Sequence, residues 1–233
     1  DIPDKRKVHK TPIPRIGGLG IYAGFLLGYL LLGEQDIAMN SILIGSFVII
    51  IFGLIDDIKP MPAQIKFIGQ LIASLIVVFY GNILLSDLSA FGIYINFGIL
   101  KYPITVLFIL GCINSINLID GLDGLAGGLS AIYFLTIGII SLMMFNYLTL
   151  EVILTFIMLG CTLGFLMHNF YPSTIFMGDT GSMFLGYIIS VIALLGFNPV
   201  TVDSAVPPYC NKFAEIVTLP DIVAGNIVKL PVA

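Results

Sequence analysis

Five aspartates in three separate motifs are the candidate catalytic or metal-binding residues of this sequence: Asp56, Asp57, Asp120, Asp123 and Asp179. None of the three motifs contains histidine or cysteine, so their carboxylates favour Mg²⁺, with Mn²⁺ as an alternative, over Zn²⁺. A basic amino-terminal segment supplies cations that could pair with phosphate oxygens. Carboxylates that hold a metal, together with cations that bind phosphate, predict phosphoryl transfer as the reaction class.

Asp56 and Asp57 are adjacent at the end of an apolar run. Such carboxylates can be structural, by reaching toward water or by capping a helix. A charge near hydrocarbon is unfavourable, however, by about 2.5–3.5 kcal/mol at the centre of a span and less near its ends, and two adjacent like charges must share protons or a cation. We therefore favour a functional role for the pair.

The second motif runs from Asn117 to Gly124 and places Asp120 and Asp123 three residues apart, hence on one side if the segment is helical. Asp-Gly pairs are also common in turns, so an ordinary connection between two helices is the alternative interpretation. The motif gains weight only if it lies on the same side of the molecule as Asp56.

The third motif, Phe176 to Ser182, places Asp179 between two glycines just before an apolar run. Backbone amides at the start of a helix could bind a phosphate there while Asp179 held its metal. The alternative is a structural helix cap, in which Asp179 or Thr180 accepts hydrogen bonds from the first free amides.

The segments on either side of these motifs are predicted to be transmembrane helices. Of the 233 residues 58% are hydrophobic and 10% are charged, and the mean hydropathy of +1.06 lies outside the range of soluble domains. No basic face with interleaved aromatic residues is present, so nucleic-acid binding has no support. Because a bilayer core needs about 20 apolar residues per helix, we sought runs near that length. The expected spans are Gly17–Gly33, Ser41–Ile55, Ile65–Tyr80, Tyr102–Leu118, Leu125–Phe145, Val152–Met167 and Ser182–Phe197.

Lys and Arg collect before the first span, which predicts a cytoplasmic amino end. Counting spans from there places all three acidic motifs on the cytoplasmic face and the segment Asn82–Leu100 outside. Alternation from Ile93 to Phe97 predicts a short extracellular β-hairpin in that segment. The fold class is therefore an all-α, polytopic transmembrane bundle of about seven spans, in a plasma membrane.

The three motifs, in order and together with the amino-terminal stretch Asp1–Gly18, resemble the bacterial polyprenyl-phosphate N-acetylhexosamine-1-phosphate transferases. The sequence of Pro12–Gly18 is similar to the corresponding segment of the bacterial GlcNAc-1-phosphate transferases that begin teichoic-acid and O-antigen linkage. The resemblance implies transfer of GlcNAc-1-phosphate from UDP-GlcNAc to undecaprenyl phosphate with Mg²⁺ and release of UMP. The expected partners are thus UDP-N-acetylhexosamine, undecaprenyl phosphate and the lipid bilayer, with a homodimer left open.

The resemblance also implies roles for individual residues. Asp179 would be a metal ligand, and Asp56 and Asp57 would bind or deprotonate the lipid phosphate and assist the metal. The second motif would line the nucleotide-sugar pocket and the basic segment would meet phosphates, through the residues Asn117, Asp120, Asp123, Lys5, Arg6, Lys7, His9 and Arg15.

The resemblance covers residues 1–197 and implies that the family continues beyond both ends, with an earlier span, later helices and a cytoplasmic His-rich loop. We therefore expect a partial transferase domain over 1–197, inefficient by itself, followed by a tail of other origin over 198–233. A MurNAc-pentapeptide phosphotransferase is the nearest alternative. A non-catalytic fragment and an ion-coupled transporter are alternatives of other classes, the latter disfavoured because transporter carboxylates lie near the bilayer midplane and these lie at span ends.

Overall fold

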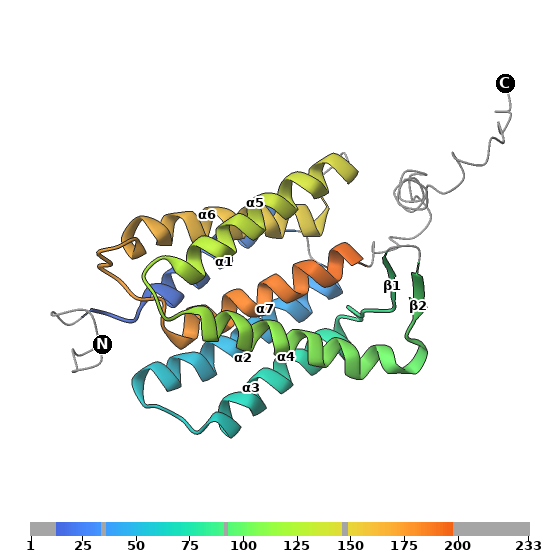
Figure 1. The fold of residues 1–233 in the computed structure, drawn as a ribbon, viewed down its shortest axis with the longest axis horizontal. Coiled ribbons are helices and arrows are strands. Elements are labelled where there is room, and N and C mark those ends of the chain that lie inside the picture. Colours follow the sequence, from blue (N-terminus) through green and yellow to red (C-terminus); the bar gives the residue numbers. More distant parts are fainter. Residues whose placement is uncertain (1–12, 34–35, 91–92, 146–148, 198–233) are drawn as a thin grey trace, which may run out of the picture.

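The computed structural model describes residues 13–33, 36–90, 93–145 and 149–197 as a helical bundle (Figure 1). Its α-helices are α1 (Gly17–Leu32), α2 (Ile37–Ile58), α3 (Ala63–Leu75), α4 (Lys101–Ile119), α5 (Leu125–Phe145), α6 (Leu150–Asn169) and α7 (Gly178–Phe197). A π-helical turn, η1 (Ile76–Tyr80), extends α3, and a 3₁₀ turn, η2 (Gly98–Leu100), leads into α4. The predicted all-α class is confirmed.

Six helical segments in the described residues are long and apolar enough to cross a bilayer, and α1, with 16 residues, is a shorter apolar helix. Large apolar side chains on the outside of the bundle remain exposed, as Leu30 and Leu107 are. A soluble protein would bury such side chains, whereas lipid tails solvate them. The chain is therefore a multi-pass membrane protein.

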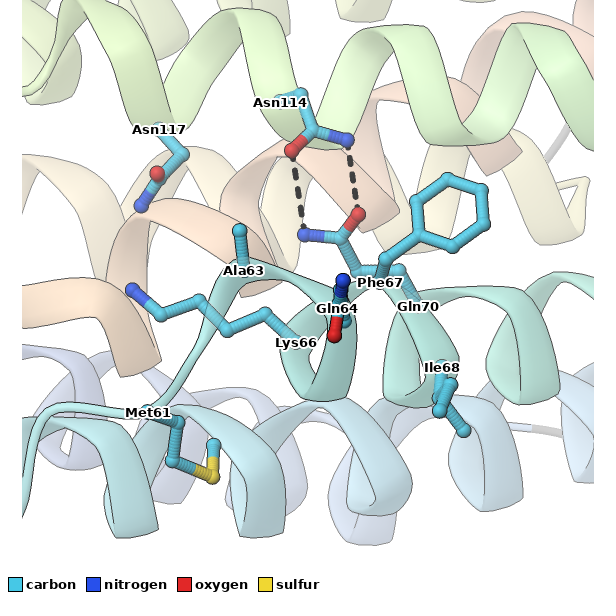
Figure 2. A pocket seen from close by; sticks show the side chains of 9 residues that line it. All are labelled: Met61, Ala63, Gln64, Lys66, Phe67, Ile68, Gln70, Asn114 and Asn117. Atoms are coloured by element: carbon cyan, nitrogen blue, oxygen red, sulfur yellow. Dashed lines mark hydrogen bonds between the residues drawn. The ribbon is translucent and has the colours of Figure 1, made fainter.

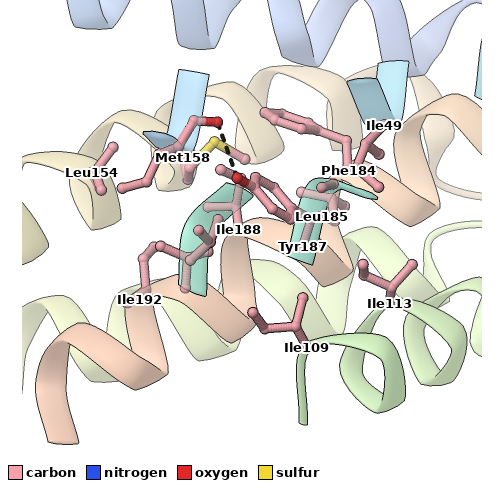
Figure 3. Close-up of a cluster of buried hydrophobic side chains, with 14 of the residues drawn as sticks. Ile49, Ile109, Ile113, Leu154, Met158, Phe184, Leu185, Tyr187, Ile188 and Ile192 are labelled. Carbon is pink, nitrogen blue, oxygen red and sulfur yellow. Dashed lines mark hydrogen bonds between the residues drawn. The ribbon is translucent and has the colours of Figure 1, made fainter. Parts of the chain in front are cut away.

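Helix α7 is the centre of the bundle and contacts α1, α2, α4, α5 and α6. Neighbouring backbones approach it closely: a Cβ atom at Gly186 would lie 2.6 Å from the Cα atom of Ile113 on α4. Tyr187 is fully buried, and its hydroxyl donates a hydrogen bond of 3.1 Å to the carbonyl of Ile42 on α2 (Figure 3). That bond satisfies the only polar atom of a side chain otherwise surrounded by apolar groups.

The connections of the bundle divide between its two ends (Figure 1). The start of α1 and the α2–α3, α4–α5 and α6–α7 connections lie at one end, and the β-hairpin lies at the other. Strand β1 (Asp87–Ala90) pairs antiparallel with β2 (Ile93–Asn96), and Asp87 is opposite Asn96. The predicted hairpin is confirmed, and so is the placing of the three acidic motifs at one end.

At the end of the bundle that carries the acidic motifs, helices α2 and α7 extend three and four residues beyond the spans expected from hydropathy. Helix α2 continues to Ile58, so Asp56 and Asp57 belong to its last turn, and α7 begins at Gly178, four residues before Ser182. Both extensions have the same physical reason, since polar groups of each helix end are satisfied by the other, as described below. The predicted tail over 198–233 lies outside the described residues.

The topology predicts opposite accessibility for two exposed positions, Lys59 after α2 and Asn96 in β2. In a background without cysteine, Asn96→Cys should react with an impermeant maleimide added to intact cells. Lys59→Cys should react only after permeabilisation, because the positive-inside rule predicts that the basic amino end and its side of the bundle face the cytoplasm. Equal labelling of the two positions from outside would contradict this orientation.

Candidate active site

The polar motifs meet where four helix ends converge: the end of α2, the start of α3, the end of α4 and the start of α7 (Figure 1). Each motif lies in the last or first turn of a helix or in the adjoining loop. Helix ends leave backbone amides and carbonyls unpaired, so this end of the bundle offers both charged side chains and free backbone groups.

An ammonium group links two of the predicted carboxylates. The Nζ atom of Lys66, in the first turns of α3, lies 2.6 Å from Oδ2 of Asp56 and 2.5 Å from Oδ2 of Asp179. Asp56 is 8% exposed and also accepts a hydrogen bond of 2.7 Å from the amide of Met61. Asp56 and Asp179, 123 residues apart in the chain, are thus brought together on one cation.

Asp57 is held by the start of α7. Its Oδ1 accepts a bond of 2.9 Å from the amide of Asp179, and its Oδ2 accepts bonds of 3.0 and 2.6 Å from the amide and hydroxyl of Thr180. A carboxylate at a helix amino end also interacts favourably with the helix dipole, by about 0.3–2 kcal/mol. The cap foreseen for α7 therefore exists, but α2 supplies it.

Asn117 and Asp120 bring the end of α4 to the same place. The amide group of Asn117 donates a bond of 2.8 Å to the hydroxyl of Ser182 on α7. Burial and the negative charges of Asp179 and Asp57, opposed by the positive charge of Arg15, together raise the pKa of Asp120 to about 6. These four charged groups are therefore close enough to interact, and Asp120 titrates near the pH at which general acids and bases work best.

Asp123 binds a different segment, the connection between α6 and α7. Its Oδ2 accepts a bond of 3.1 Å from the amide of Ser173, and the amide of Gly124 donates a bond of 3.0 Å to the side chain of Asn169. Asn169 in turn donates to the carbonyl of Ile175 at 2.9 Å. Asp123 thus ties the second motif to the loop that leads into the third.

A groove of about 690 Å³ opens beside Lys66, between α3 and α4 (Figure 2). Gln70 and Asn114 face each other across it through a reciprocal pair of amide hydrogen bonds, of 2.8 and 3.4 Å. Phe67 and Ile68 add apolar surface and Asn117 a further amide group. One end of the groove is therefore charged, and Phe67 and Ile68 form an apolar part of a wall that also carries side-chain amides.

Sequence reasoning missed Lys66, Gln70 and Asn114. Lys66 is the single charged residue of the apolar run Ile65–Tyr80, and an ionisable group inside a span is a functional candidate by default, so the signal was present. Arg15 is described and exposed. Lys5, Arg6, Lys7 and His9 lie outside the described residues, and their predicted contacts with phosphate stay predictions.

The donor chemistry of Asp56 and Asp179 fits Mg²⁺. Their carboxylates converge on one cation, the Lys66 ammonium, and Mg²⁺ in proteins is usually held by one or two carboxylates together with substrate phosphates. In the described part of the chain no group of three or more His, Cys, Asp or Glu side chains could hold a metal. The arrangement suits a metal whose remaining ligands come from substrate and water.

Comparison with known proteins finds a family profile and several relatives that match most of the chain. Residues 39–197 match the sequence profile of glycosyl transferase family 4. The chain is 44% identical over 213 residues to the probable undecaprenyl-phosphate N-acetylglucosaminyl 1-phosphate transferase of Bacillus subtilis, a match that covers 89% of this chain and 58% of that protein. It is 33% identical to the decaprenyl-phosphate N-acetylglucosaminephosphotransferase of Mycobacterium leprae, over 85% of this chain and 54% of that one.

A phospho-N-acetylmuramoyl-pentapeptide-transferase of Prochlorococcus marinus is 37% identical, over 80% of this chain and 56% of that protein. The chain thus spans a little over half the length of these relatives. The family match runs from the third residue of α2 to the end of α7, and so includes all five aspartates and Lys66. With its helical fold and its three motifs at one end of the bundle, the chain belongs to glycosyl transferase family 4.

Proposed function

We propose that this protein transfers N-acetylglucosamine 1-phosphate from UDP-GlcNAc to undecaprenyl phosphate at the cytoplasmic face of a bacterial plasma membrane. The observation that carries the proposal is the ion cluster of Asp56, Lys66 and Asp179 at the charged end of the groove between α3 and α4. A site that joins a nucleotide sugar to a lipid phosphate needs charges for the donor diphosphate and the acceptor phosphate, beside a surface that accepts hydrocarbon.

The acceptor would enter by the groove. Its phosphate would meet the Lys66 ammonium, and its first isoprene units would lie against the apolar wall that includes Phe67 and Ile68. A phosphate oxygen of the acceptor then attacks the sugar-linked phosphorus of UDP-GlcNAc. The bond between that phosphorus and the oxygen bridging to UMP breaks, UMP leaves, and a new diphosphate joins lipid and sugar.

Asp56 and Asp179 would hold Mg²⁺, which when bound neutralises negative charge on the donor diphosphate. The ammonium of Lys66 has the same charge sign and lies between the same two carboxylates, so it would turn from the carboxylates toward the phosphate oxygens as the donor binds. A lipid phosphate is already an oxyanion at neutral pH, so its attack needs positioning and charge neutralisation more than a strong base.

The second motif and the basic segment would bind the nucleotide sugar. Asn117 and Asp120 lie beside the start of α7, and Asp123 fixes the loop that precedes it. Arg15 extends the positive charge of the amino-terminal segment to this end of the bundle. GlcNAc is proposed as the sugar because the relative with 44% identity is named for it, whereas the muramoyl-pentapeptide relative is 37% identical.

Replacing Lys66 should abolish most transfer, because the two carboxylates and the incoming phosphates would lose their shared cation. We expect Lys66→Met in the full-length protein to lower the rate by at least about a hundredfold, the size associated with loss of one charged group that stabilises the transition state. Lys59→Met is the matched control, since Lys59 is exposed beyond the end of α2 and should keep normal rates. Radiolabelled sugar transfer to undecaprenyl phosphate measures both, and equal rates would contradict the role of Lys66.

Removing the metal should stop the reaction. EDTA should abolish transfer, and Mg²⁺ added afterwards should restore it. Asp179→Asn should lower the rate by several orders of magnitude, since it removes a metal ligand and not a core contact. Asp36→Asn is the matched control, because Asp36 caps α2 at the opposite end and Asn caps equally well. Full activity in EDTA, or of Asp179→Asn, would rule out the metal role.

A further inference from the structure

We propose that Asp57 is a positioning residue: its carboxylate fastens the end of α2 to the start of α7 and so places Asp179 opposite Asp56. This inference rests on the proposed function, because it divides the roles of two adjacent aspartates in the same reaction. It assigns no proton transfer or attack to Asp57.

Both carboxylate oxygens of Asp57 are occupied by α7. Oδ1 accepts from the amide of Asp179, and Oδ2 accepts from both the amide and the hydroxyl of Thr180, all within 3.0 Å. A carboxylate offers about four lone-pair sites, and three of them are used here by groups of a single helix turn. Two of the donors are main-chain amides that no intrahelical bond could satisfy.

The contact between Asp57 and α7 requires a glycine. Gly178 has φ of +72°, and a Cβ atom there would lie 2.6 and 2.7 Å from the two carboxylate oxygens of Asp57. One turn earlier on α2, a Cβ atom at Gly53 would lie 2.5 Å from the Cα atom of Thr180. The two helices therefore approach closely on either side of the carboxylate, and both oxygens of this half-buried side chain are already bonded to donors of α7.

Asp56 has the opposite surroundings. Successive residues of an α-helix point about 100° apart, so while Asp57 faces α7, its neighbour faces α3 and the ammonium of Lys66. The cation lies between Asp56 and the side chain of Asp179, whose own main-chain amide is bound to Asp57. Asp57 thus fixes the backbone of the residue whose side chain meets the cation.

The test is a double-mutant cycle on the full-length protein with Asp57→Asn and Thr180→Val. Thr180→Val removes the hydroxyl that donates to Asp57 and keeps the side-chain shape. Asp57→Asn replaces one carboxylate oxygen with an NH2 group, which is a donor and cannot accept hydrogen bonds from the main-chain amides of α7. Each variant should lower kcat by about tenfold or more and change the KM for UDP-GlcNAc by less than about twofold, because Asp179 is displaced while the nucleotide pocket is kept. The kcat of the double variant should be at most about threefold lower than that of the slower single variant, since both changes break the same contact.

Thr180→Ser keeps the hydroxyl and is the conservative control, expected to retain most of kcat. A reacting carboxylate at Asp57 would give the contrary result, with Thr180→Val near the wild-type rate and the effect of Asp57→Asn undiminished in the double variant. That outcome would overturn the proposal.

Thermal unfolding in detergent of the wild type, Asp57→Asn, Thr180→Val and the double variant separates this inference from the proposed function. The two substitutions should lower the unfolding temperature by less together than the sum of their separate effects, whether or not the wild type transfers GlcNAc-1-phosphate. An inactive wild type whose variants show these less-than-additive shifts would refute the proposed function and support the positioning role of Asp57. Additive shifts in unfolding temperature would refute the positioning role of Asp57, whatever the activity of the wild type.

Discussion

The requirement that every charge beside hydrocarbon have a partner is the constraint on which this site depends. Asp56 and Asp179 share the Lys66 ammonium, and Asp57 is neutralised by amides at the positive end of α7. An unpaired carboxylate at these positions would be strongly unfavourable next to lipid. Because the partners come from α2, α3 and α7, satisfying the charges also fixes where three helix ends lie.

Helix α7 carries this arrangement into the bundle. Most of its residues are buried, so its position is set by five neighbouring helices and not by the loops around the site. Its buried polar side chains bond within the protein, as Tyr187 does to the carbonyl of Ile42 and Ser182 to that of Gly178. The groups that would react therefore stand on a rigid element, as precise phosphoryl transfer requires.

The sequence predicted the helical class, the hairpin and the gathering of the acidic motifs, because hydropathy reports span length and each span reverses the direction of the chain. It did not predict the partners of Asp57 or the place of Lys66 between Asp56 and Asp179, because those contacts join residues more than a hundred positions apart or on different helices. The expected ends of α2 and α7 were wrong by three and four residues for the same reason. Hydropathy places a boundary where charge begins, whereas here the charges are satisfied across helices and the helices continue.

The close backbone contacts around α7 divide the positions of this protein into two classes, which differ in how freely they can be substituted. Outward positions such as Leu30 and Leu107 need only be apolar, so many substitutions there are neutral. At Gly53, Gly178 and Gly186 a single methyl group would meet a carboxylate or a neighbouring backbone within 2.6 Å. Divergent relatives should therefore be recognisable by glycine at these positions as much as by aspartate in the acidic motifs.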